Sequence, residues 1–194
     1  MATPRRVQFP GMVTHVTVRG VDGEPIYRVQ PDRECWLTIL DGVVRETEVE
    51  CHAWCQMTNH AHMLFATPQG NLAKAMQILN GEYARAFNRR HGRRGHVYER
   101  RYSSILIERQ AHLLEVARYT VRNPIGAGLC EHPAEWPWSS YRATAGLTEP
   151  PRFLTTGWIL SQFSPDHRRA RELYAEFVAA GSPAASVEGL LLAA

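Results

Sequence analysis

Two histidines stand one residue apart in an apolar run, in the stretch QMTNHAHMLF at residues 56–65. Alternate residues of a β-strand point to the same side, so His60 and His62 would share one face and Ala61 and Met63 the other. The two histidine Cα atoms would lie about 6.6–7 Å apart, and two imidazoles at that spacing can reach one ion at about 2.0–2.2 Å per bond. The spacing predicts a metal site; the alternative is two half-exposed strand histidines.

A tyrosine and an asparagine stand four residues apart in AHLLEVARYTVRNP, residues 111–124. Residues at this spacing share one face of a helix, so Tyr119 and Asn123 would lie together, with His112 and Val116 continuing the stripe. A phenol beside a carboxamide and close to a metal ligand suits a nucleophile. The apolar positions that would anchor this helix to the core are Leu113, Leu114, Ala117 and Val121.

A zinc site that recruits two cysteines is a rival interpretation of the histidine pair. Cys51 and Cys55 are four residues apart, which on a strand is about 13 Å, too far for two thiolates to share one ion. Alternation would also place Cys51, Ala53 and Cys55 on the apolar face of their strand and His52 and Trp54 on the opposite face. We therefore predict that both cysteines are core residues.

Length and composition predict one ordinary globular domain with a sizeable core. The chain has 194 residues, of which 44% are hydrophobic and 21% charged. No run of 18 apolar residues occurs, so we expect no membrane span. The start, MATPRRVQFPG, lacks an apolar stretch, and four scattered cysteines are too few for a disulfide framework. We expect a cytoplasmic protein.

Positive charge is concentrated in one part of the chain. Residues 81–109 hold eight arginines and three glutamates, a net charge of +5, although the whole chain carries only +3. A concentrated basic segment favours nucleic acid as the partner, and a merely solvated charged face is the alternative. The arginines that we expect to contact DNA there are Arg85, Arg89, Arg90, Arg93, Arg94, Arg100 and Arg101.

The order of the predicted elements is β-α-β-β-α-β with one further helix. The segments are strand 14–20, helix 31–44, strands 48–56 and 60–67, helix 71–92, strand 96–108, and helix 111–123 stopped by Pro124. This order predicts an α+β, ferredoxin-like antiparallel sheet with two helices on one face. We divide the chain into a domain at 1–145 and a helical extension at 146–194, with WPWSSYR (136–142) as a hydrophobic clamp between them rather than a base-stacking platform.

Three separated motifs resemble those of the REP-associated tyrosine transposases, a branch of the single-tyrosine HUH transposases of bacterial insertion sequences. The motifs are CHAWCQMTNHAHMLF, LNGEYARAFNRRHGRRGHVYERRYSSILIE and ARYTVRNPIGAGLCEHPAEWPWSSYR. They occur in the family's order, and the resemblance covers about residues 5–145. Thr58 stands where the family often has Pro, but it is not one of the expected ligands.

The resemblance implies that His60 and His62 bind a divalent metal, Mg²⁺ or Mn²⁺, with Asn123 as the third protein ligand. It implies that Tyr119 is the nucleophile, which cuts single-stranded DNA next to hairpins formed by palindromic repeats and leaves a 5′-phosphotyrosine. His112 is a candidate base. Relatives include monomers and dimers that exchange the tyrosine helix, so either state is expected.

The same resemblance suggests where DNA binds. The basic run would hold the hairpin backbone, with Tyr98 and Tyr102 stacking on bases. Arg5 and Arg6, in the segment TPRRVQF, would reach bases near the foot of the hairpin.

Three rival functions share parts of this pattern. An RNA-binding module with the same type of sheet would display stacking aromatics on its central strands, where this chain has His60, His62 and Leu64. A relative that binds hairpins without cutting them would have no need of His60, His62, Tyr119 and Asn123. A metal-dependent hydrolase would use water and form no bond between protein and DNA.

Overall fold

Four antiparallel strands form one sheet in the order β2-β3-β1-β4. The computed structural model describes residues 8–108, 110–181, 187 and 189. The strands are β1 (Met12–Arg19), β2 (Glu50–Gln56), β3 (His60–Thr67) and β4 (Ser103–Leu106). The longer helices are α1 (Gln30–Thr47), α2 (Leu72–Arg90), α3 (Gln110–Gly126) and α6 (His167–Ala179), and the shorter ones are η1 (Val21–Gly23), η2 (Pro133–Glu135), α4 (Tyr141–Thr144) and α5 (Gly157–Ser161). The predicted ferredoxin-like α+β fold is confirmed.

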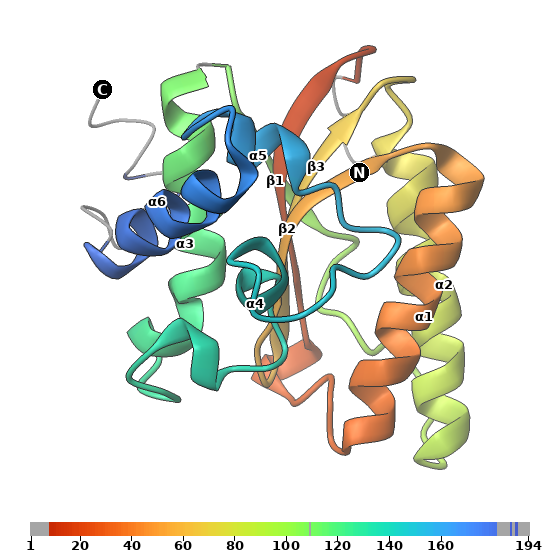
Figure 1. Ribbon diagram of the computed structural model, residues 1–194. Helices are drawn as coiled ribbons and strands as arrows, with labels where there is room; N and C mark the ends of the chain where they lie inside the picture. Colours follow the sequence, from red (N-terminus) through yellow and green to blue (C-terminus); the bar gives the residue numbers. More distant parts are fainter. Residues whose placement is uncertain (1–7, 109, 182–186, 188, 190–194) are drawn as a thin grey trace.

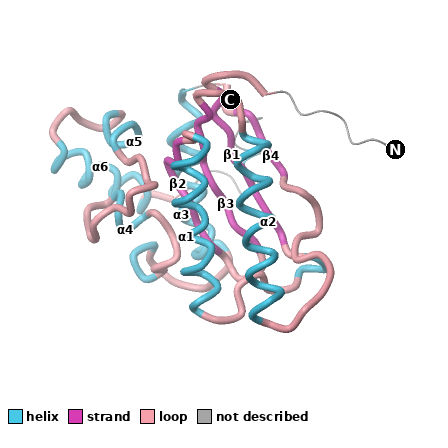
Figure 2. Tube along the Cα trace, turned by 90° about the vertical axis from the view of Figure 1, so that its right-hand side faces the viewer, coloured by secondary structure: helices cyan, strands magenta, loops and turns pink. Residues whose placement is uncertain are grey.

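Helices cover both faces of this sheet. Figure 1 shows α1 and α2 on one side and α3 to α6 on the other, and Figure 2 shows α1 and α2 lying side by side across the strands. Ala61, Met63 and Phe65 of β3 are fully buried against the α1–α2 layer, as predicted. The opposite side of the same strand, which carries His62 and Leu64, therefore faces α3 and the C-terminal helices.

The C-terminal segment completes the core on the α3 side. Ile159 and Leu160 of α5 and Tyr174 and Val178 of α6 are buried in one cluster with Val121 of α3. No described helix is both long enough and apolar enough to cross a membrane.

A β-bulge in β2 overturns the simple alternation expected for that strand. The register shifts between Cys51, opposite Phe65, and Ala53, opposite Leu64. Trp54 consequently packs in the same core cluster as Cys51, while Ala53 joins the cluster on the other face. The bulge is where the C-terminal extension attaches, because the Thr155 N–H donates to the Cys51 carbonyl at 2.8 Å.

Both strand cysteines are core residues, as predicted. Cys51 and Cys55 are fully buried and free. Burial raises the pKa of both thiols, which disfavours the thiolate that zinc requires.

The motif WPWSSYR forms the predicted clamp. The Trp136 indole donates to the Gln56 carbonyl at 3.0 Å, and the Trp138 carbonyl accepts from the Gln56 N–H at 2.8 Å. The Arg33 guanidinium lies 5.4 Å from the ring centroid of each tryptophan. These contacts bind the segment after η2 to the end of β2 and to α1.

Two predicted element boundaries were wrong. The segment predicted as strand 96–108 is a regular strand only over β4, because residues 97–99 bond irregularly near the end of β1. The Val21 N–H donates to the Val97 carbonyl at 3.1 Å, and the Glu99 N–H donates to the Arg19 carbonyl at 3.0 Å. Helix α3 also continues past Pro124 to Gly126 instead of stopping before it.

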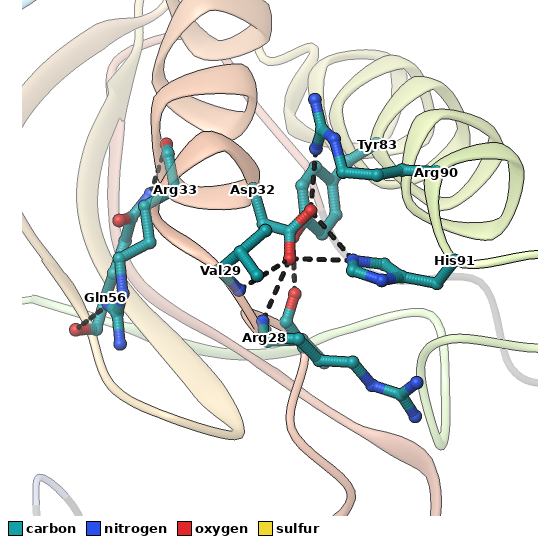
Figure 3. Close-up of polar contacts among 9 residues, drawn as sticks. Arg28, Val29, Asp32, Arg33, Gln56, Tyr83, Arg90 and His91 are labelled. Carbon is teal, nitrogen blue, oxygen red and sulfur yellow. Dashed lines mark hydrogen bonds and ion pairs between the residues drawn. The ribbon is translucent and has the colours of Figure 1, made fainter.

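A buried carboxylate joins the start of α1 to the end of α2, as Figure 3 shows. Asp32 accepts from the backbone N–H groups of Arg28 at 2.9 Å and Val29 at 3.1 Å, which satisfies free donors at the helix start. Its oxygens also contact the Arg90 guanidinium at 2.6 Å and His91 at 2.9 Å. Burial on its own would raise the pKa of the Asp32 carboxyl, but these hydrogen bonds outweigh it and lower that pKa.

We expect Asp32→Asn to lower the free energy of unfolding by about 2–3 kcal/mol, because hydrogen bonds to a charged group are lost. The pKa of Asp32 is lower in the folded than in the unfolded chain, so this stabilisation is complete above about pH 4 and disappears as the pH falls through the lowered value. Urea unfolding of both proteins from pH 7 to pH 2.5 should show the difference shrinking below about pH 4.

Asp41→Asn is the matched control, since Asp41 lies on the same helix but forms a more exposed pair with Arg45 at 3.1 Å. It should cost less than about 1 kcal/mol. Equal losses for the two variants would contradict the role of Asp32.

Candidate active site

Neighbouring strands bring three histidines together on the face of the sheet below α3. His62 of β3 is directly opposite Thr17 of β1, and His15 lies one pleat away on the same face. The His62 ring stacks on His15, with centroids 5.2 Å apart and planes at 21°, and meets the His60 ring at 4.9 Å and 83°. The predicted shared face of His60 and His62 is therefore observed.

Each of the two predicted ligands has its Nδ1 atom hydrogen-bonded. The His60 Nδ1 is 2.7 Å from the Asn59 Oδ1, and the His62 Nδ1 is 3.1 Å from the His15 Nε2. The His62 Nε2 is buried and has no hydrogen-bond partner among the described residues. A buried acceptor of this kind suits a metal ion.

The environment keeps these imidazoles neutral at pH 7. Burial lowers the pKa of His15 to about 4, and burial with the nearby Arg19 charge lowers the pKa of His60 to about 4. Burial, followed by repulsion from His15 and His60, holds the pKa of His62 well below its usual range. Metal binding requires neutral imidazoles, so the electrostatics fit the donor set.

Helix α3 brings Tyr119 over these rings. The Tyr119 ring meets that of His62 edge-on, with centroids 5.8 Å apart and planes at 89°, and that of His15 at 6.1 Å and 81°. All of these residues belong to one chain, so the arrangement needs no exchange of helices between subunits.

A cavity of about 140 Å³ lies between the tyrosine and the strands. Its lining consists of His15, Thr17, His62, Ser103, Ile105, Tyr119 and Val187. His15, Thr17 and Ser103 were missed by the sequence analysis. The alternation of THVTVRG does place His15 and Thr17 on one face, but only the pairing of β1 with β3 shows that this face is the histidine face.

The Asn123 side chain also holds its own helix together. Pro124 has no N–H to offer the Thr120 carbonyl one turn earlier. The Asn123 Nδ2 donates to the Tyr119 carbonyl at 2.8 Å and reaches the Thr120 carbonyl at 3.4 Å, so the amide replaces the missing donor. Its Oδ1 remains the end available to a cation, which is the atom that a hard divalent ion prefers.

The protein supplies a small ligand set. Within the described parts of the chain, no group of three or more His, Cys, Asp or Glu side chains is placed to hold a metal ion. His60 and His62 meet ring to ring on this face, and the cavity lining includes His62 but neither His60 nor Asn123.

The basic segment runs from α2 towards this site. Arg85, Arg89, Arg90, Arg94, Arg100 and Arg101 are exposed, and Arg93 is half-buried. The Glu99 N–H bonds to the Arg19 carbonyl at the end of β1, so Arg100 and Arg101 begin beside β1, which separates them from the histidine strand β3. Arg90 pairs with Asp32, and Arg5 and Arg6 lie outside the described residues.

One expectation near the site is corrected. Tyr102 is buried, and Tyr98 packs beside Tyr83 with its hydroxyl buried, so neither is available for stacking on bases. Val116 is buried in the cluster against which Tyr119 packs, in line with the predicted stripe. His112 is also buried, and its Nε2 has no hydrogen-bond partner among the described residues, so its role as a base stays a prediction.

A ferredoxin-like sheet that places a His-x-His strand beneath a tyrosine-bearing helix is the arrangement expected of the single-tyrosine transposases. The model of the IS200-like transposase family matches residues 12–123, more than half of the chain. The chain belongs to this family, which confirms the resemblance drawn from its motifs.

Two solved structures resemble the chain. One is a REP-associated tyrosine transposase bound to a REP hairpin, with a TM-score of 0.64, 17% identity, and coverage of 80% of this chain and 92% of that one. The other is a putative transposase from Deinococcus radiodurans, with a TM-score of 0.43, 16% identity, and coverage of 66% and 97%. No curated protein matches the sequence. At these identities the first likeness supports the fold.

We expect Asn123→Ala to lower the free energy of unfolding by about 1 kcal/mol, because two carbonyls lose a donor. In a Pro124→Ala background the loss should be smaller, since the alanine N–H can bond to the Thr120 carbonyl. Urea unfolding of the four proteins should give a coupling energy of at least about 0.5 kcal/mol. Strict additivity would contradict the replacement of the missing N–H by the amide.

Proposed function

We propose that the protein cuts and rejoins single-stranded DNA beside palindromic hairpins, with Tyr119 as the nucleophile. The observation that carries the proposal is the position of the Tyr119 ring, 5.8 Å from that of His62, whose Nε2 is buried with no hydrogen-bond partner in the described part of the chain. Membership of the IS200-like transposase family supports the reaction class. The hairpin bound to the structurally similar transposase supports the substrate and a place in the REP-associated branch.

The chemistry would be a transesterification. The Tyr119 oxygen attacks the scissile phosphorus, the new bond replaces the bond to the 3′ oxygen, and the phenolic proton passes to solvent. The leaving 3′ oxygen takes up a proton, so the products are a 5′-phosphotyrosine and a free 3′-OH. Because the phosphoester bond is conserved, a second 3′-OH can reverse the step and rejoin the strand.

In this proposal a divalent Mg²⁺ or Mn²⁺ ion would be held by His60 and His62, through Nε2, and by Asn123, through Oδ1. When bound, the ion would supply Lewis-acid polarisation of the phosphate. Tyrosine side chains ordinarily ionise near pH 10, so Tyr119 needs a positive neighbour to attack at neutral pH. Exclusion of water by Ile105 and Val187, which line the cavity, would strengthen that electrostatic effect.

DNA would approach along the basic segment. Arg100 and Arg101 are exposed and come shortly before Ser103, which lines the cavity, so they are our candidates for holding the phosphate backbone. Arg85 and Arg89 extend the positive surface along α2, where the stem of a hairpin would lie. In this proposal one chain supplies both Tyr119 and the histidines, which the edge-on contact of the Tyr119 and His62 rings within the chain supports.

Tyr119→Phe should abolish a covalent adduct between the protein and DNA and leave hairpin binding within about twofold, because only the attacking oxygen is removed. The measurement is denaturing gel electrophoresis after incubation with Mn²⁺ and a labelled single strand that carries the host's palindromic repeat.

His60→Ala and His62→Ala are the companion variants, and both should lose the adduct and its dependence on Mn²⁺ while still binding the hairpin. If the wild-type protein is folded and binds the hairpin but forms no adduct, it is a hairpin-binding protein that does not cleave DNA. Release of cut DNA without any adduct would indicate a hydrolase instead.

Arg100→Gln combined with Arg101→Gln should weaken hairpin binding and reduce its salt dependence. Each lost phosphate contact lowers the slope of log K against log [salt] by about 0.7–0.9, so the double variant should lose about 1.5. Fluorescence anisotropy between 50 and 300 mM salt measures the slope. Arg168→Gln with Arg169→Gln, an exposed pair on α6, removes the same charge and should change the slope little.

A further inference from the structure

His15 contacts a predicted metal ligand through one specific pair of atoms. It is 3% exposed, lies on β1, and places its Nε2 3.1 Å from the His62 Nδ1. The Thr17 Oγ1 is a longer contact of the same nitrogen, at 3.4 Å, which makes His15 the closer partner. The two rings are nearly parallel, with their planes at 21°. Neither the family resemblance nor the sequence pattern assigned this residue a role.

Two neutral arrangements of this pair are possible, and they differ in what His62 can bind. If the His15 Nε2 carries the proton, the His62 Nδ1 accepts it and the buried His62 Nε2 becomes an N–H donor with no acceptor. If the His62 Nδ1 carries the proton, His15 accepts it and the His62 Nε2 keeps a lone pair. Only the second arrangement makes His62 a ligand, since the tautomer is fixed by the hydrogen bond of the other ring nitrogen.

The second ligand shows the same arrangement with no ambiguity of direction. The Asn59 Nδ2 donates to the Gly23 carbonyl at 3.0 Å, so the Asn59 Oδ1 is the atom that faces the His60 Nδ1 at 2.7 Å. An amide oxygen only accepts, which places the proton on the His60 Nδ1 and leaves its Nε2 as the ligand atom. Both histidines thus have an acceptor behind Nδ1.

We propose that His15 is a positioning residue that accepts the His62 Nδ1–H and so presents the His62 Nε2 as a metal ligand. This inference rests on the proposed metal-binding role of His62. Partners of this type orient ligating histidines and increase their basicity, and their loss commonly weakens metal binding about 10- to 100-fold. His15 would act through His62, without contacting the DNA or the ion.

Two substitutions separate this role from simple packing. His15→Phe keeps a ring in the buried position but removes the acceptor. His15→Gln removes the ring but restores an acceptor, because the Gln Oε1 stands as many bonds from Cα as the His Nε2 does. Thermal unfolding of both variants reports how much each perturbs the core.

The first measurement is the affinity for Mn²⁺, from the electron paramagnetic resonance signal of the free ion. We expect His15→Phe to bind Mn²⁺ about 10- to 100-fold more weakly than wild type and His15→Gln to remain within about threefold of wild type. The second measurement is the tautomer of His62 in the metal-free protein, from ¹⁵N chemical shifts of labelled histidine. His62 should be protonated on Nδ1 in wild type and in His15→Gln, and should shift towards the Nε2–H form in His15→Phe.

Asn59→Ala is the matched variant for the other ligand. It should change the tautomer of His60 and leave that of His62 as in wild type, whereas His15→Phe should do the reverse. Equal losses of affinity and thermal stability in His15→Phe and His15→Gln, or an unchanged His62 tautomer in His15→Phe, would overturn the proposal.

The outcomes distinguish this inference from the proposed function. If wild type binds Mn²⁺ through His60 and His62 and His15→Phe binds it equally well, the inference fails alone. If the affinities and tautomers change as expected but no DNA adduct forms, the inference stands and the cleavage reaction fails. If wild type does not bind Mn²⁺, both the inference and the metal site fail.

Discussion

The antiparallel register between β1 and β3 determines which side chains meet on the histidine face of the sheet. It sets Thr17 opposite His62 and Arg19 opposite His60, so His15 reaches His62 as a diagonal neighbour on the same face. A shift of β3 by one residue would turn His60 and His62 towards the α1–α2 core, where Met63 and Phe65 are now buried. The hydrophobic side of β3 therefore fixes the position of the chemistry on its other side.

Burial on both faces of the sheet explains why the histidines are unusual. In a sheet with one solvated face, His60 and His62 would be ordinary exposed residues with unperturbed pKa values. Here α3 and the C-terminal helices cover that face, and the Thr155 contact at the β2 bulge ties the extension to the sheet. The helices that bury the apolar residues on this face also bury the imidazoles, and burial keeps the imidazoles neutral.

The fold and the shared faces of the candidate site residues could be predicted from the sequence because they depend on local periodicity. Alternation gave the shared face of His60 and His62, and helical spacing joined Tyr119 to Asn123. What could not be predicted depends on contacts between distant segments: the role of His15 needs the β1–β3 register, and the face of Trp54 needs the bulge. Tyr98 and Tyr102 lie in a basic segment, which predicted exposed rings, although Tyr102 is buried and Tyr98 has a buried hydroxyl.

The choice of residue at position 123 illustrates how structural and chemical demands converge. An aspartate there would offer an oxygen to a cation but has no N–H for the Tyr119 and Thr120 carbonyls. An alanine would leave the Thr120 carbonyl without the donor that Pro124 cannot supply, whereas the Tyr119 carbonyl would keep the backbone N–H of residue 123. Asparagine alone meets both requirements with a short side chain, because its Nδ2 continues the helix and its Oδ1 remains for a ligand. The helix turn that holds Tyr119 in place is therefore stabilised by the same side chain that we propose as its metal-binding neighbour.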